Sequence, residues 1–129
     1  MLLNLSDLSD EPLQSQISRQ IRAKILAGDL LAADSLLSIR AMARNLKVSV
    51  ITVQRSYESL ERSGLIIARR GKGFFVAEID SALKKKMAED KLAEKISPII
   101  KEALAEGMNP EEMNNIIHAS INQIRQKKL

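Results

Sequence analysis

The chain has 129 residues, of which 45% are hydrophobic and 28% charged, so it has the size and composition of a single globular domain with a small appendage. This length excludes a large catalytic domain, and the lack of cysteine excludes disulfides and thiolate metal sites. No apolar run approaches the roughly 18 residues of a membrane span, and the first ten residues carry two acids and no base, unlike a signal peptide. We therefore expect a cytoplasmic protein without a membrane partner.

Positive charge is concentrated in the middle of the chain, although the net charge is only +4. Residues 1–39 carry three bases and five acids, and residues 73–129 carry nine of each. Residues 40–72, in contrast, carry eight bases against two acids. A compact basic region of this kind is typical of proteins that bind a polyanion such as nucleic acid.

Three helices are predicted in the first half of the chain. The first covers about residues 11–27, where apolar side chains recur every four residues, and it ends at Gly28. Ser38 is a suitable N-cap for a short second helix, and Ser49 is one for a third helix that runs to about Ser63. The apolar side chains on the expected buried faces of these helices are Leu13, Ile17, Ile21, Ile25, Leu26, Ile39, Met42, Ala43, Leu46, Val53, Tyr57 and Leu60.

A β-hairpin is predicted after the third helix. Two short apolar runs, residues 65–68 and 74–76, flank the basic sequence Arg69-Arg70-Gly71-Lys72-Gly73. The order helix, helix, turn, helix, hairpin over residues 11–77 is that of a winged helix-turn-helix. In this fold the second helix of the pair lies in the major groove of DNA, and the hairpin, or wing, reaches the neighbouring backbone.

From Asp80 onward the composition changes to Ala, Lys, Glu and Ile, in a pattern that predicts amphipathic helices. Pro98 interrupts the first of these, and because proline lacks a backbone N–H we expect a kink or a break into two helices there. Asn109 and Pro110, followed by two glutamates, supply the N-cap, first residue and first-turn acids of a last helix. This helix is expected to bury Met113, Ile116, Ile117, Ile121 and Ile124.

These terminal helices carry more apolar surface than two short helices can cover between them, so a second subunit is the expected cover. The residues expected at this contact are Leu92, Ile96, Ile99, Ile100, Met113, Ile117, Ile121 and Ile124. The predicted fold is mainly α with a small β-hairpin wing. Residues 1–78 would form the winged helix-turn-helix DNA-binding domain, and residues 79–129 a helical dimerisation region.

The spacing of several short motifs resembles that of the GntR family of bacterial transcription regulators. The matching segments include Pro12-Leu13, Gly28-Asp29-Leu30, Leu46-Lys47-Val48-Ser49, Gly64-Leu65-Ile66 and Arg70-Gly71-Lys72-Gly73-Phe74-Phe75-Val76. The short remainder is similar to the YtrA-like subfamily, whose members pair subunits through two helices in place of a large ligand-binding domain. The resemblance covers about half of the chain and implies a regulator that binds double-stranded DNA.

The resemblance and the winged-helix reading together give a set of expected DNA contacts. These are Arg40, Lys47, Ser49, Val50, Thr52, Gln54, Arg55, Arg70, Gly71 and Lys72. Two positions depart from the family pattern: Leu37 stands where a proline is usual, and Val50 where the wider family often has a guanine-reading arginine. By helical phase Val50 faces the groove, whereas Ile51 either fills the core or meets thymine methyl groups. Whether Arg55 replaces the missing arginine stays open.

The sequence therefore predicts a homodimeric, sequence-specific DNA-binding regulator, a repressor that occludes a promoter at an inverted-repeat operator. A rival reading is a winged helix that binds another protein, which the basic wing argues against. An enzyme is not expected, because the chain shows no nucleophile, metal cluster or paired carboxylates. His118, the single histidine, has no acid or cysteine at a neighbouring helical position, so we expect a structural role. No cofactor is expected, and a small-molecule effector cannot be named.

Overall fold

The structure is a computed structural model that describes residues 2–127, and these form five helices and one two-stranded antiparallel sheet. The chain divides into two compact units, one that extends to Lys85 and one that starts at Lys86. Among the described residues, no helix is both long and apolar enough to cross a membrane.

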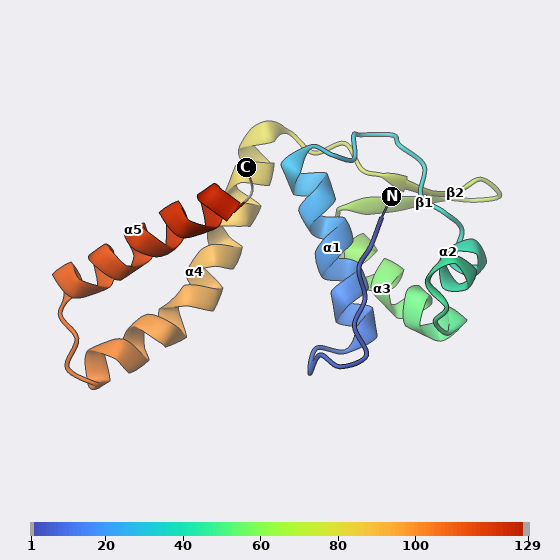
Figure 1. Ribbon diagram of the computed structural model, residues 1–129. Coiled ribbons are helices and arrows are strands. Elements are labelled where there is room, and N and C mark those ends of the chain that lie inside the picture. The colour runs from blue at the N-terminus through green and yellow to red at the C-terminus, as the bar shows by residue number, and fades with distance from the viewer. Residues whose placement is uncertain (1, 128–129) are drawn as a thin grey trace. The chain divides into compact units, whose positions relative to one another are not determined.

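The first unit has the predicted winged helix-turn-helix order. It contains helices α1 (Leu13–Ala27), α2 (Ile39–Leu46) and α3 (Val50–Arg62), followed by strands β1 (Ile66–Arg69) and β2 (Gly73–Val76) (Figure 1). Helix α1 begins two residues later than expected, because Pro12 has an extended ψ of 147° and serves as its N-cap.

The predicted caps account for the sharp turn between α2 and α3. The Ser38 side chain accepts a hydrogen bond from the backbone N–H of Ala41, and Ser49 accepts one from that of Thr52, both at 3.1 Å. Between the two helices, Lys47 adopts a left-handed conformation with φ of 58° and ends α2. Only three residues therefore separate the helices, which fixes the direction in which α3 leaves the turn.

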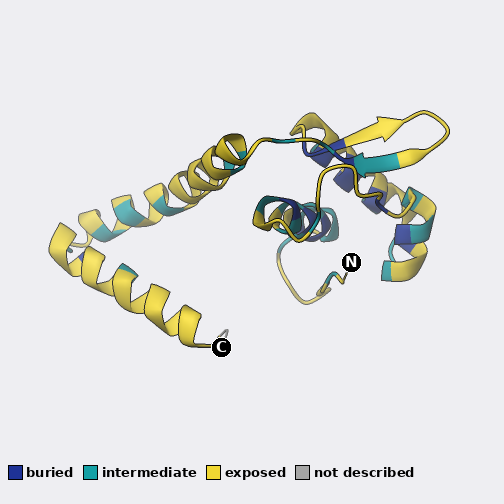
Figure 2. Ribbon diagram, turned by 90° about the horizontal axis from the view of Figure 1, so that it is seen from above, coloured by how far each residue is buried: buried dark blue, intermediate teal, exposed yellow. Residues whose placement is uncertain are grey.

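The core of the first unit is aliphatic around one tyrosine. Tyr57 is buried, its ring packs edge-on against Phe74 at 4.9 Å between centroids, and its hydroxyl donates a hydrogen bond to the carbonyl oxygen of Leu37 at 2.7 Å. Burial raises the pKa of Tyr57 above its ordinary value. The other large buried side chains are Ile17, Ile21, Ile25, Leu36, Met42, Val53, Leu60, Leu65, Ile66 and Val76 (Figure 2). Ala43 is buried as predicted, whereas the predicted Leu13, Leu26, Ile39 and Leu46 are only half-buried.

The hairpin is anchored to the unit by the loop that precedes α2. Its strands pair from Ile66 opposite Val76 to Arg69 opposite Gly73. On the other edge of β2, Ala33 and Leu36 donate backbone hydrogen bonds to Val76 and Phe74, both at 2.9 Å. An isolated two-stranded hairpin is marginally stable in water, so these additional bonds hold the base of the wing.

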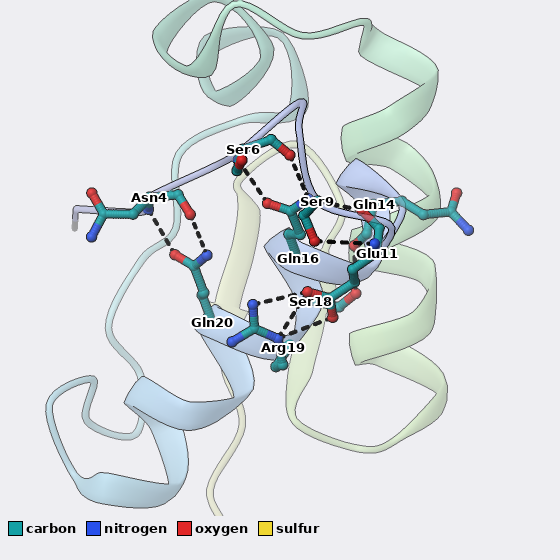
Figure 3. A network of polar contacts seen from close by, with 9 residues as sticks. All are labelled: Asn4, Ser6, Ser9, Glu11, Gln14, Gln16, Ser18, Arg19 and Gln20. Atoms are coloured by element: carbon teal, nitrogen blue, oxygen red, sulfur yellow. Dashed lines mark hydrogen bonds and ion pairs between the residues drawn. The ribbon is translucent and has the colours of Figure 1, made fainter. Parts of the chain in front are cut away.

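An extended segment before α1 is held against this helix by two glutamine side chains (Figure 3). The Gln16 amide accepts a hydrogen bond from the backbone N–H of Ser6 and donates one to the backbone carbonyl oxygen of Ser6, both at 2.9 Å. One turn later, Gln20 makes the same reciprocal pair with Asn4. Arg19 forms an ion pair with Glu11 at 2.9 Å, which raises the pKa of Arg19.

The second unit consists of most of α4 (Ser81–Ala105) and of α5 (Pro110–Lys127). Helix α4 is continuous through Pro98, so of the two expected alternatives, a kink or a break into two helices, the break is wrong. Pro98 lies on an exposed stretch, where water can solvate the carbonyl group that loses its N–H partner. The start of α5 is as predicted, because Asn109 and Glu112 exchange reciprocal hydrogen bonds in a capping box.

The predicted burial of the last helix is wrong in part. Met113 is buried and Ile117 half-buried, but Ile116, Ile121 and Ile124 are each at least half exposed. The reason is geometric: α4 and α5 diverge from the turn that joins them, so each covers the other only near that turn (Figure 2). Leu92, Ile99 and Leu104 of α4 are likewise exposed.

Candidate nucleic-acid interface

Helix α3 presents one face to the core and the opposite face to solvent. Val53, Ser56, Tyr57 and Leu60 are buried, at the spacing of one helical face. The exposed residues of α3 are Val50, Ile51, Gln54, Arg55, Glu58, Glu61 and Arg62. Side chains four residues apart are neighbours on a helix, so Val50 lies next to Gln54 and Ile51 next to Arg55. The helix therefore offers a narrow mixed surface with apolar residues in its first turn and polar residues in its second.

Polar side chains on α3 hold one another in place. The hydroxyl groups of Ser49 and Thr52 share a hydrogen bond at 2.7 Å, and Ser49 also accepts from the backbone N–H of Thr52. The amide nitrogen of Gln54 donates to the carboxylate of Glu58 at 3.2 Å. Ser56, on the buried side, donates to the carbonyl oxygens of Gln14 and Thr52, which ties α3 to α1.

Five exposed basic residues lie along α2, the turn and α3, and three of them are predicted DNA contacts. Arg40 is in the first turn of α2, Lys47 ends that helix, and Arg55 is in the second turn of α3. Within residues 2–127 the ion pairs join Arg19 to Glu11 and Lys86 to Asp90, so none of these three bases is neutralised by a described carboxylate. Their charge is available to an anionic partner.

The tip of the wing is the second basic element. The backbone N–H of Lys72 donates to the carbonyl oxygen of Arg69 at 2.9 Å and closes the turn, and Gly71 in it has a φ of 75°. The guanidinium group of Arg69 lies 5.3 Å from the centre of the Phe75 ring, a distance at which a cation and an aromatic ring attract each other. Arg70 and Lys72 are exposed.

The ten predicted DNA contacts thus lie on α2, the following turn, α3 and the wing tip. Ser49 and Thr52 touch each other directly, whereas Arg70, Gly71 and Lys72 belong to a separate element. Ile51, for which the sequence left two alternatives, is 54% exposed and does not fill the core. The helical spacing of Ile51 from the buried Val53, Tyr57 and Leu60 places it on the solvent face. This spacing is the sequence signal from which the exposure of Ile51 could have been predicted.

A polar cavity of about 250 Å³ lies between α1 and α3. Its walls include the side chains of Ser15 and Ser18 on α1 and of Arg55 and Arg62 on α3. Sequence reasoning did not indicate it, because the pattern of one helix does not show which polar residues of another helix face it.

The second unit contains the remaining candidate sites, the single histidine and an apolar cavity. His118 is exposed on α5, and within the described part of the chain no three His, Cys, Asp or Glu side chains gather where they could hold a metal ion. In the second unit, an apolar cavity of about 190 Å³ lies beside the turn between α4 and α5, with Ile96, Ile100, Met113 and Ile117 among its walls. Farther along the two helices, Leu92, Ile121 and Ile124 are exposed.

A three-helix unit with an anchored hairpin, an exposed third helix and a basic tip defines a winged helix-turn-helix protein. Comparison with known proteins gives the family: residues 13–76 match the bacterial regulatory proteins of the gntR family. The chain is 37% identical over 108 residues to the HTH-type transcriptional regulator YhcF of Bacillus subtilis. The aligned residues are 81% of this chain and 86% of that protein. The chain belongs to the GntR family of transcription regulators.

Other similarities agree with this membership and with the YtrA-like character of the chain. The HTH-type transcriptional repressor YtrA of Bacillus subtilis is 31% identical over 77 residues, which are 60% of this chain and 59% of that protein. A GntR family transcriptional regulator from Listeria monocytogenes has a TM-score of 0.76 at 30% identity and covers 89% of this chain and 98% of its own. The DNA-binding domain of AraR in complex with its operator ORX1 has a TM-score of 0.51 at 26% identity, over 58% of this chain and 93% of its own.

Proposed function

We propose that this GntR-family regulator is a repressor that binds an inverted-repeat operator as a homodimer. Residues 1–78 would be the DNA-binding domain, residues 79–129 the dimerisation region, and the site of action the cytoplasm, where bacterial DNA lies. The observation that carries the proposal is the exposed face of α3, which lies between basic residues that have no ion-pair partner among the described residues. The operator-bound AraR domain and the repressor YtrA, both similar to this chain, support it.

The expected interaction divides between the two basic elements. The first two turns of α3 would enter the major groove, where base edges can be read, while Arg40 and Lys47 bind flanking phosphates. Arg70 and Lys72 would reach the neighbouring backbone, and Gly71 allows the close approach of the wing tip. The proposed activity is DNA binding, and none of these residues is assigned a catalytic role.

The dimer follows from surface that one chain leaves uncovered. On α4 and α5, Leu92, Ile99, Ile116, Ile121 and Ile124 are 50–64% exposed although the sequence pattern places them in apolar stripes. Monomers rarely expose a continuous apolar patch of more than a few hundred Å². A second copy can cover it through a two-fold interface, and two winged helices related by this axis would read half-sites of opposite orientation, one or two helical turns apart.

Footprinting and a salt titration test the proposal. Fragments from upstream of the protein's own operon should yield a protected, inverted-repeat site. The logarithm of the association constant should fall steeply with the logarithm of salt concentration, because phosphate contacts release counterions. A winged helix that serves to bind another protein would give no protected site and no such slope.

A further inference from the structure

Two adjacent aliphatic side chains stand exposed at the start of the proposed recognition helix. Val50 is 44% and Ile51 54% exposed, and both lie in the first turn of α3. Single exposed aliphatic residues are ordinary on protein surfaces. Here, however, two neighbours occupy the turn that the fold places deepest in a DNA groove.

Three polar side chains beside this pair, those of Ser49, Thr52 and Gln54, form hydrogen bonds within the chain. The Ser49 hydroxyl accepts a hydrogen bond from the backbone N–H of Thr52 and shares another with the Thr52 hydroxyl. The side-chain amide of Gln54 donates a hydrogen bond to the Glu58 carboxylate. The two hydroxyls share a single O–H···O hydrogen bond and keep one donor proton between them, whereas the side chains of Val50 and Ile51 are pure hydrocarbon. The contact that Val50 and Ile51 can make with a base is therefore apolar.

The surroundings of the pair are basic. Lys47 lies three residues before Val50, and Arg55 lies one turn after Ile51 on the same side of the helix. An apolar centre with cationic neighbours fits the major groove at A·T pairs, where phosphates form the edges and the thymine C5-methyl projects from the floor. At a G·C pair the same side chains would cover the acceptors N7 and O6 of guanine without offering a donor, which is unfavourable.

We propose that Val50 and Ile51 read thymine methyl groups, so that each operator half-site carries thymine under the first turn of α3. This inference rests on the proposed DNA-binding function and specifies the base chemistry that the site selects. Burial of one methyl-sized group contributes on the order of fourfold in affinity. Each half-site should therefore contain one or two positions at which loss of the thymine methyl weakens binding by about that factor.

The experiment replaces each operator thymine in turn by deoxyuridine, which removes the methyl group and keeps base pairing. Kd is measured in a gel-shift titration at fixed salt for the wild type, Val50→Ala and Ile51→Ala. The wild type should bind the uracil operator more weakly at one or two positions in each half-site. At these positions the alanine variants should bind thymine and uracil operators with nearly equal affinity. The control variant Leu31→Ala, which shortens an exposed aliphatic side chain outside α3, should keep the wild-type ratio.

Three outcomes would overturn the inference, and they are distinguishable. Tight operator binding that is insensitive to every uracil substitution removes the methyl readout and leaves the proposed function intact. A thymine-to-uracil ratio that survives in both alanine variants assigns the readout to other residues. Failure of the full-length protein to bind any fragment in the footprint defeats the proposed function together with the inference.

Discussion

At the scale of single residues, Gln16 shows how a polar side chain can be part of a core. It is 3% exposed, and its amide makes three hydrogen bonds, two with the backbone of Ser6 and one with the carbonyl oxygen of Glu11 (Figure 3). Because every polar atom of this amide has a partner, its burial carries no unpaired group. The residue joins the segment before α1 to the helix.

Replacement of Gln16 by alanine should lower the free energy of unfolding by about 1–3 kcal/mol, because backbone groups that are partly buried lose their partners. Urea denaturation of the full-length protein measures this. The matched control is Gln20→Ala, which removes the same kind of reciprocal pair at an exposed position and should cost less. Equal losses for the two variants would show that burial does not decide the effect.

Tyr57 should make the protein sensitive to alkaline pH. Its pKa is raised by burial, so in the folded state the phenol keeps its proton beyond the pH at which the unfolded chain, with an ordinary pKa of about 10, releases it. The contribution of Tyr57 to stability is thus complete below about pH 10 and is lost as pH rises beyond it. Since Tyr57 is the single tyrosine, absorbance at 295 nm reports it alone. Ionisation near pH 10 in protein that is still folded would contradict the prediction.

At the scale of the elements, local signals in the sequence account for most of the first unit. Ser38 and Ser49 cap their helices as expected, because an N-cap depends on residues within one turn. The exposure of Ile51 also follows from a local signal, its helical phase relative to Val53 and Tyr57. The partners of Gln16, in contrast, depend on how separate elements pack, and the periodicity of one helix does not contain this information. The continuity of α4 through Pro98 has the same cause, since solvation of the freed carbonyl is set by surroundings outside the local sequence.

The wing should supply affinity more than sequence preference. Arg69, Arg70 and Lys72 are all exposed, but Arg69 lies over the Phe75 ring, whereas Arg70 and Lys72 belong to the turn at the tip. Replacement of these two by alanine should reduce the slope of log K against log salt concentration by about two, since each phosphate contact contributes about 0.9. The order of preference among operator variants should not change. An unchanged slope would place the wing away from DNA.

At the scale of the whole molecule, the two units differ in how much apolar surface each buries within one chain. The first unit buries a continuous aliphatic core around Tyr57, whereas in the second Met113 is the single described side chain classed as buried. The sequence indicated surplus apolar surface there, yet it could not show that α4 and α5 diverge, because this depends on the turn between them. The uncovered surface is thus larger than two closely packed helices would leave.

Ile121→Asp should convert the proposed dimer into monomers. Ile121 is half exposed within its own chain, so an aspartate there is solvated in the monomer but becomes an unpaired charge in a dimer interface, at a cost of about 3–5 kcal/mol. Light scattering at micromolar concentration should give twice the 14.3 kDa of one chain for the wild type and a single chain for the variant. Asn122→Asp, which adds the same charge at the next exposed position of α5, should remain dimeric.

The monomeric variant should also lose tight binding to the full inverted repeat, since one winged helix makes half of the contacts. A monomeric wild type, or an Ile121→Asp variant that stays dimeric, would assign these apolar faces another role.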